Sequence, residues 1–165
     1  MPSGESADAP PGGAPTRSVE ASVQIPARPE RVLRAFLDAE DLRGWWKASR
    51  SLVEPEPGGL WSVTWDDYGA ERSHHVWAGR IEEIGPRHLL VTDLLMVEPE
   101  RRLFGPLQIE VRAEPSAEGT LLTLQHRGYQ YGEDWNWAYE TVIRGWDHVL
   151  GDMQEWFGAK RADGM

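Results

Sequence analysis

The sequence predicts an α+β fold, in which a series of antiparallel strands is followed by one long helix. Three observations support this prediction. Apolar and polar residues alternate near the start, turn signals separate the segments in the middle, and apolar residues at helical spacing occupy the end. With 165 residues, the chain has the length of one domain.

The first segment, residues 1–17, is rich in Pro, Gly, Ala and Ser and has no large apolar side chain after Met1. Such a composition cannot bury enough surface to offset the entropy cost of ordering, so we expect a disordered tail. The folded domain is expected over residues 18–158, followed by a flexible C-terminus over residues 159–165.

The folded part is expected to begin with a strand and two short helices. Apolar and polar residues alternate from Val19 to Ile25, which predicts a strand that ends at Pro26. Pro29 is a favourable residue for the first turn of a helix. A second helix is expected to be capped by Asp38 and to stop at Gly44.

Six further strands are expected in the middle of the chain, because turn residues separate successive segments with strand character. These segments are Ser49–Glu54, Leu60–Asp66, His74–Ile84, Arg87–Val97, Leu107–Glu114 and Thr120–Arg127. The segment Glu98–Arg102 is interpreted as a solvated loop.

A long helix is expected from about Trp135 to Phe157, with Asp134 as its N-cap and Gly158 as its end. Its apolar residues recur every three or four positions and therefore share one face. They are Trp135, Tyr139, Val142, Trp146, Val149, Leu150, Met153 and Phe157.

Composition and charge exclude several classes of function. The absence of cysteine excludes a disulfide scaffold, a thiolate nucleophile and a cysteine-bound zinc site. The net charge of -10 argues against binding to nucleic acid or to an anionic membrane. No apolar segment reaches the roughly 20 residues of a membrane span, and the start of the chain has no secretory signal. We therefore expect a cytoplasmic protein.

The common catalytic and metal-binding motifs are also missing. There is no HExxH, GxSxG, P-loop or GxGxxG pattern. His74 and His75 are adjacent on an expected strand and so point to opposite faces. We expect no metal and no cofactor, and assign no catalytic residue. The candidates for acid–base chemistry in a cavity are His75, His126, Arg127 and Tyr139.

The nine tryptophans indicate a large core, an aromatic pocket, or both. Trp61 and Trp65 share one face of an expected strand, and His75 and Trp77 share a face of the next. Within the long helix, Gly145 directly precedes Trp146 and leaves room for a close approach of backbone or ligand.

The order of the elements and several short motifs resemble the helix-grip fold of the SRPBCC (START/birch-pollen-allergen-like) superfamily. Within it, the similarity is to the branch named for the activator of heat-shock protein 90 ATPase. The motifs are Trp45-Trp46, Pro57-Gly58-Gly59, GRIEEIGP at 79–86, Gly119-Thr120-Leu121-Leu122, His126-Arg127-Gly128 and Gly145-Trp146. The resemblance, over residues 18–158, implies a curved sheet of about seven strands that grips the last helix around a deep cavity.

The resemblance and the tryptophan content together suggest non-enzymatic binding of a hydrophobic or aromatic small molecule, for transport, sequestration or self-resistance. Two alternatives stay open: a cyclase or aromatase of polyketide-like substrates, and a chaperone-associated protein. The protein partners considered are a chaperone and a second copy of the chain. The expected ligand-binding residues are Trp45, Trp61, Trp65, His75, Trp77, His126, Tyr139, Val142 and Trp146.

Overall fold

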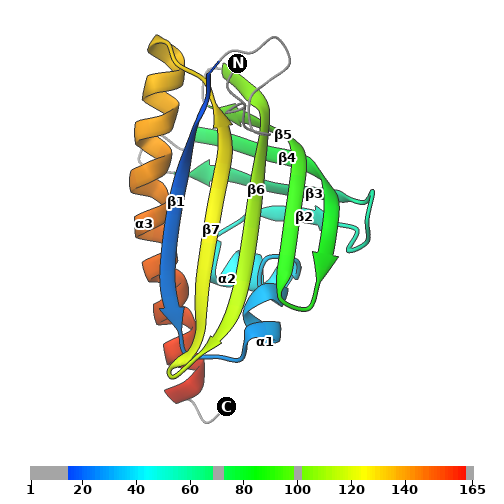
Figure 1. Ribbon diagram of the computed structural model, residues 1–165, viewed down its shortest axis with the longest axis vertical. Coiled ribbons are helices and arrows are strands. Elements are labelled where there is room, and N and C mark those ends of the chain that lie inside the picture. The colour runs from blue at the N-terminus through cyan, green and yellow to red at the C-terminus, as the bar shows by residue number, and fades with distance from the viewer. Residues whose placement is uncertain (1–14, 69–72, 99–101, 163–165) are drawn as a thin grey trace, which may run out of the picture.

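The strands form one antiparallel sheet, against which the long C-terminal helix packs (Figure 1). The structure is a computed structural model that describes residues 15–68, 73–98 and 102–162. In this part of the chain the sheet has seven strands in the order β1-β7-β6-β5-β4-β3-β2. The α+β fold class and the element order expected from the sequence are confirmed.

The element bounds agree with the expected segments to within a few residues in most cases. The strands are β1 (Arg17–Ile25), β2 (Arg50–Val53), β3 (Leu60–Tyr68), β4 (Ser73–Gly85), β5 (His88–Glu98), β6 (Arg102–Ser116) and β7 (Gly119–Tyr129). The helices are α1 (Pro29–Arg34), α2 (Ala39–Trp46) and α3 (Glu133–Ala162).

Both ends of the folded domain extend further than expected. Arg17 belongs to β1, where its register partner is Tyr129 of β7, so it is not part of the expected tail. Residues 1–14 of that tail lie outside the described residues. At the other end, α3 continues through Gly158, which lacks the left-handed conformation of a helix-ending glycine. Residues 159–162 are thus helical, and 163–165 lie outside the described residues.

The expected end of α2 at Gly44 is also wrong. The helix continues to Trp46, and Lys47 then takes the left-handed conformation, with φ 61° and its N–H bonded to the carbonyl of Leu42. A Cβ added at Gly44 would lie 2.6 Å from the indole of Trp156 on α3. The glycine therefore allows α2 to pack closely against α3 instead of ending the helix.

The core lies between one face of the sheet and the helices. α3 packs chiefly against β1 and also contacts α2. Its buried residues follow the spacing that places side chains on one helix face. They are Ala138, Trp146, Val149, Leu150, Met153 and Phe157. Among the described helices, none is long and apolar enough to cross a membrane.

The side of β5 that faces the core changes at Asp93. Leu89 and Val91 are buried before this position, whereas Met96 and Glu98 are buried after it. Asp93 is exposed, has φ 53°, and coincides with register shifts against both neighbouring strands. Because strand side chains alternate between faces, this irregularity turns the even-numbered residues that follow it towards the core.

Candidate functional site

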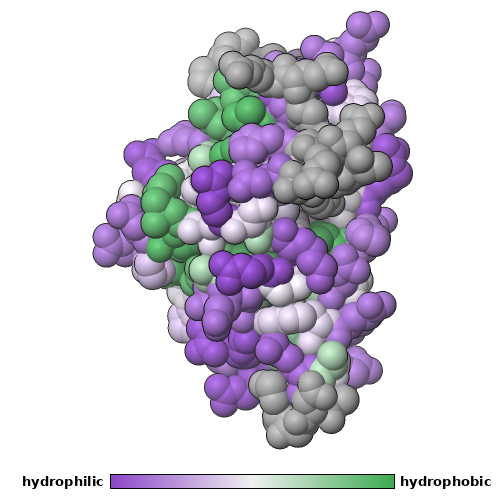
Figure 2. Space-filling model, turned by 180° about the vertical axis from the view of Figure 1, so that it is seen from behind, coloured by the Kyte–Doolittle hydropathy of each residue, from purple (hydrophilic) through white to green (hydrophobic). Residues whose placement is uncertain are grey.

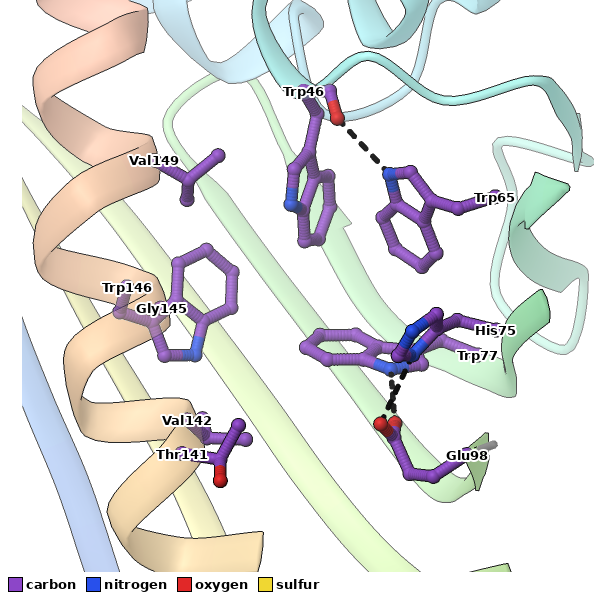
Figure 3. Close-up of a pocket in the computed structure, with 10 residues that line it drawn as sticks. All are labelled: Trp46, Trp65, His75, Trp77, Glu98, Thr141, Val142, Gly145, Trp146 and Val149. Atoms are coloured by element: carbon purple, nitrogen blue, oxygen red, sulfur yellow. Dashed lines mark hydrogen bonds and ion pairs between the residues drawn. The ribbon is translucent and has the colours of Figure 1, made fainter. Parts of the chain in front are cut away.

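A cavity of about 110 Å³ lies between α3 and the inner face of strands β3 to β5 (Figure 3). An apolar cavity of about 150 Å³ holds benzene, so this space suits a group of roughly that size or slightly smaller. The residues that line it are Trp46, Trp65, His75, Trp77, Glu98, Thr141, Val142, Gly145, Trp146 and Val149.

The sheet register explains why polar residues meet on the strand side of the cavity. Trp65 of β3 pairs with His75 of β4, and Val76 of β4 pairs with Val97 of β5. The same register places His75 opposite Glu98. Neighbouring strands lie about 4.8 Å apart, which brings side chains on the same face into contact.

The carboxylate of Glu98 is the polar centre of the cavity. Its Oε1 lies 3.0 Å from Nδ1 of His75, and its Oε2 accepts a hydrogen bond from the indole N–H of Trp77 at 3.3 Å (Figure 3). The side chain of His75 is 18% exposed and that of Glu98 is 9% exposed. A carboxylate–imidazole pair is thus built into an otherwise aromatic wall.

The indole of Trp46 joins the aromatic side chains into one cluster. Its ring centroid lies 5.0 Å from that of Trp65, 5.5 Å from Trp77 and 5.3 Å from Trp146. The rings of Trp46 and Trp77 are nearly perpendicular, a favourable arrangement because ring edges are positive and ring faces negative. Trp65 also donates its indole N–H to the backbone carbonyl of Trp46 at 2.9 Å, which ties β3 to the end of α2.

Helix α3 supplies the opposite wall. Val142, Trp146 and Val149 follow one another at spacings of four and three residues and so share a helix face. Thr141 and Val142 are only half-buried, and Gly145 is exposed. A Cβ added at Gly145 would meet no atom within 4 Å. The cavity therefore opens towards solvent beside Gly145.

His126 lies behind the cavity wall and is fully buried. Its Nδ1 accepts a hydrogen bond from the indole N–H of Trp146 at 3.2 Å, and its ring packs 5.3 Å from that of Trp77. Burial lowers the pKa of His126 to about 3, so the imidazole is neutral near pH 7. An acceptor at Nδ1 places the proton on Nε2, for which the described residues offer no hydrogen-bond partner. His126 thus orients Trp146 from outside the cavity.

The structure brings only part of the predicted set together. On the cavity wall are Trp65, His75, Trp77, Val142 and Trp146. The predicted residues that do not line the cavity are Trp45, Trp61, His126 and Tyr139.

Trp45, Trp61 and Tyr139 each form a hydrogen bond away from the cavity. Trp45 and Trp61 are fully buried, and their N–H groups donate at 2.9 Å to the backbone carbonyls that follow α1. Tyr139 donates its hydroxyl to a β1 carbonyl at 3.0 Å. The acid–base candidate Arg127 forms an ion pair with Glu110 at 3.0 Å and does not line the cavity either.

Two important wall residues are absent from the predicted set. Trp46 is the last residue of α2, beyond the expected end of this helix at Gly44, and it lies on the cavity wall. Glu98, the first residue of the expected solvated loop, is the buried last residue of β5. The available signal was Asp93, a polar interruption of an apolar strand, because such an interruption can mark a bulge that reverses the faces. Arg102, at the other end of the expected loop, is the first residue of β6, and residues 99–101 lie outside the described residues.

In the described ranges no three His, Cys, Asp or Glu side chains are grouped so that they could hold a metal ion. Among the described residues that line the cavity, the acidic and histidine side chains are those of His75 and Glu98. That the protein uses no metal and no cofactor stays a prediction.

Residues 26–158 match the family model described as Activator of Hsp90 ATPase homolog 1-like protein. The chain belongs to this family. Membership confirms the resemblance inferred from the sequence motifs, and the sheet that curves around α3 confirms the helix-grip fold. No curated protein matches the sequence at a significant level.

Several solved structures share the fold of this chain at low sequence identity. A protein from Mesorhizobium loti is 19% identical, with a TM-score of 0.69 over 87% of this chain and 98% of that chain. A protein from Nitrosomonas europaea is 17% identical, with a TM-score of 0.70 over 88% and 96%. A protein of unknown function from Staphylococcus aureus is 15% identical, with a TM-score of 0.69 over 90% and 97%. At these identities, the likeness shows the fold alone.

Proposed function

We propose that this protein binds a small hydrophobic or aromatic molecule in the cavity between the sheet and α3, without converting it chemically. The observation that carries the proposal is the grouping of four indole rings around one cavity, those of Trp46, Trp65, Trp77 and Trp146. Small-molecule sites are typically apolar and aromatic, with a few polar groups that orient the ligand. The role would be transport, sequestration or self-resistance.

The volume of the cavity limits the ligand. At about 110 Å³ it accommodates one small ring or a branched alkyl group, whereas a polycyclic molecule would require wall side chains to move. The surface offers less area for an apolar ligand. The face in Figure 2 is largely hydrophilic, and its hydrophobic residues lie in separate small patches. Apolar binding is therefore better supported in the cavity than on that face.

The test fills the cavity mouth without removing any aromatic side chain. Gly145→Leu places a side chain where an added Cβ meets no atom within 4 Å. Because leucine favours helix more than glycine by nearly 1 kcal/mol, the variant should be at least as stable as the parent. We expect it to bind toluene and phenol at least about tenfold more weakly, as measured by tryptophan fluorescence and calorimetry.

The matched control is Gly151→Leu, which makes the same change in α3 away from the cavity and also in open space. It should bind as the parent does. The proposal fails if Gly145→Leu and the parent bind alike, or if no compound of a panel of monocyclic aromatics binds the parent with a Kd below about 1 mM.

Catalysis is a second candidate function, and the pair of His75 and Glu98 favours it. A carboxylate that hydrogen-bonds an imidazole is a common arrangement for general-base chemistry. On this hypothesis the protein acts on polyketide-like substrates, and His75→Gln abolishes product formation while ligand binding remains. Product analysis of the parent distinguishes the two functions, because a binding protein returns its ligand unchanged.

A further inference from the structure

The charge on the cavity wall restricts the kind of molecule that the proposed binding function accepts. Glu98 presents a carboxylate to the cavity although its side chain is only 9% exposed. Removing a carboxylate from water is costly unless an opposite charge or several hydrogen bonds compensate it. If the protein does not supply a positive charge next to Glu98, a positively charged ligand can do so.

The described residues supply hydrogen bonds to Glu98 but no permanent positive charge. The donors are the neutral indole N–H of Trp77 and Nδ1 of His75, a ring that is cationic only when both its nitrogens carry protons. In the described ranges, no lysine or arginine lies within 4.0 Å of Glu98. Its cross-strand neighbour Arg102 stacks on Trp137, 3.8 Å from the ring centroid, and forms an ion pair with Asp134 at 3.7 Å.

The negative charge of Glu98 also acts on its surroundings. The pKa of Tyr129 is raised well above its ordinary value, first by burial and then by the charge of Glu98. The tyrosine hydroxyl is consequently a neutral donor, hydrogen-bonded to the sulfur of Met96 and close to His126. It offers no positive charge to the cavity.

The aromatic wall, like the carboxylate of Glu98, favours a positively charged group. The faces of indole rings carry partial negative charge and attract cations, most strongly where water is excluded. Trp46, Trp65, Trp77 and Trp146 line the same cavity as Glu98. A group bound there meets several electron-rich rings and one carboxylate, and none of the described residues that line the cavity is an arginine or lysine that would favour an anion.

We propose that the ligand carries a positively charged nitrogen, an ammonium or alkylated ammonium attached to a small apolar or monocyclic aromatic body. The ammonium pairs with Glu98, and its apolar substituents contact the indole rings. This inference rests on the proposed binding function and adds the chemical class of the ligand. Its size follows from the volume of about 110 Å³, which admits one ring or one substituted ammonium group.

The experiment compares three probes of nearly equal size: benzylamine, which is a cation at neutral pH, neutral benzyl alcohol, and anionic benzoate. Affinities are measured by calorimetry and tryptophan fluorescence with the parent and with Glu98→Gln. Glutamine keeps the length of the side chain, and its carbonyl oxygen can accept the hydrogen bond from Trp77 while its amide N–H donates to an unprotonated Nδ1 of His75. We expect the parent to bind benzylamine at least about tenfold more tightly than benzyl alcohol, and benzoate least.

Asp93→Asn is the matched control for charge. It removes one carboxylate from the same strand at an exposed position, and asparagine tolerates the left-handed conformation there. General attraction by the net charge of -10 changes equally in both variants. Only Glu98→Gln should lose the preference for benzylamine, with its affinity for benzyl alcohol unchanged within about threefold.

The other outcomes separate the two proposals. If benzyl alcohol binds as tightly as benzylamine, or if both variants keep the preference, the cation assignment is wrong and the binding function stands. If benzylamine does not bind while neutral aromatics do, the cation assignment is again wrong and the binding function stands. If neither the probes nor the neutral aromatics bind, both proposals are wrong. A Glu98→Gln protein that does not fold is replaced by Glu98→Leu, which also removes the charge and should likewise lose the preference.

Discussion

Acidification should destabilise the protein through His126. The imidazole is fully buried, and burial lowers its pKa from 6.5 to about 3. Protonation of Nδ1 would also remove the acceptor that Trp146 uses at 3.2 Å. Below pH 6.5 the unfolded chain binds a proton at this position that the folded chain does not, so stability must fall as the pH falls.

The size of the effect follows from the pH interval. Stability is lost at about 1.4 kcal/mol per pH unit between the pKa of the unfolded state and that of the folded state. Between pH 6.5 and 3 the total is about 5 kcal/mol, and by pH 5 it is already about 2 kcal/mol. Above pH 6.5, His126 is neutral in both states and contributes no pH dependence.

Urea unfolding of the parent and of His126→Gln at pH 7, 6 and 5 measures this effect. The parent should lose about 2 kcal/mol more than the variant between pH 7 and pH 5, whatever the variant's stability at pH 7. His148→Gln, at a site that is 76% exposed, controls for the removal of a histidine. If the parent and His126→Gln lose the same unfolding free energy between pH 7 and pH 5, the argument is refuted. The imidazole would then have the same pKa in the folded and unfolded states.

Two further predictions concern packing. Trp146→Ala should cost about 3–5 kcal/mol in urea unfolding, because this buried indole contacts both Trp46 and His126; a loss below about 1 kcal/mol would show that it contributes little to the core. Gly44→Ala should be destabilising, since its Cβ would lie 2.6 Å from Trp156, whereas Gly151→Ala in open space should add about 1 kcal/mol of stability. Thermal melts of the two alanine variants should therefore shift in opposite directions, and equal shifts would contradict the packing argument.

The sequence predicted what local patterns determine. Alternation from Val19 to Ile25, the turn residues between strands, and the apolar stripe of α3 are properties of neighbouring residues, and the structure contains each of these elements. Local alternation also placed Trp65, His75 and Trp77 on faces that turn inward. Most of the residues on the strand side of the candidate site could thus be predicted from the sequence alone.

Only the tertiary structure decided which further side chains reach the cavity. Trp46 lies on the wall because Gly44 lets α2 approach Trp156, a contact between residues more than a hundred positions apart. Glu98 faces inward because the irregularity at Asp93 shifts the alternation of β5 by one residue. Periodicity shows which residues share a face, but strand register and helix docking depend on long-range pairing, and a shift of one residue exchanges the buried and exposed faces.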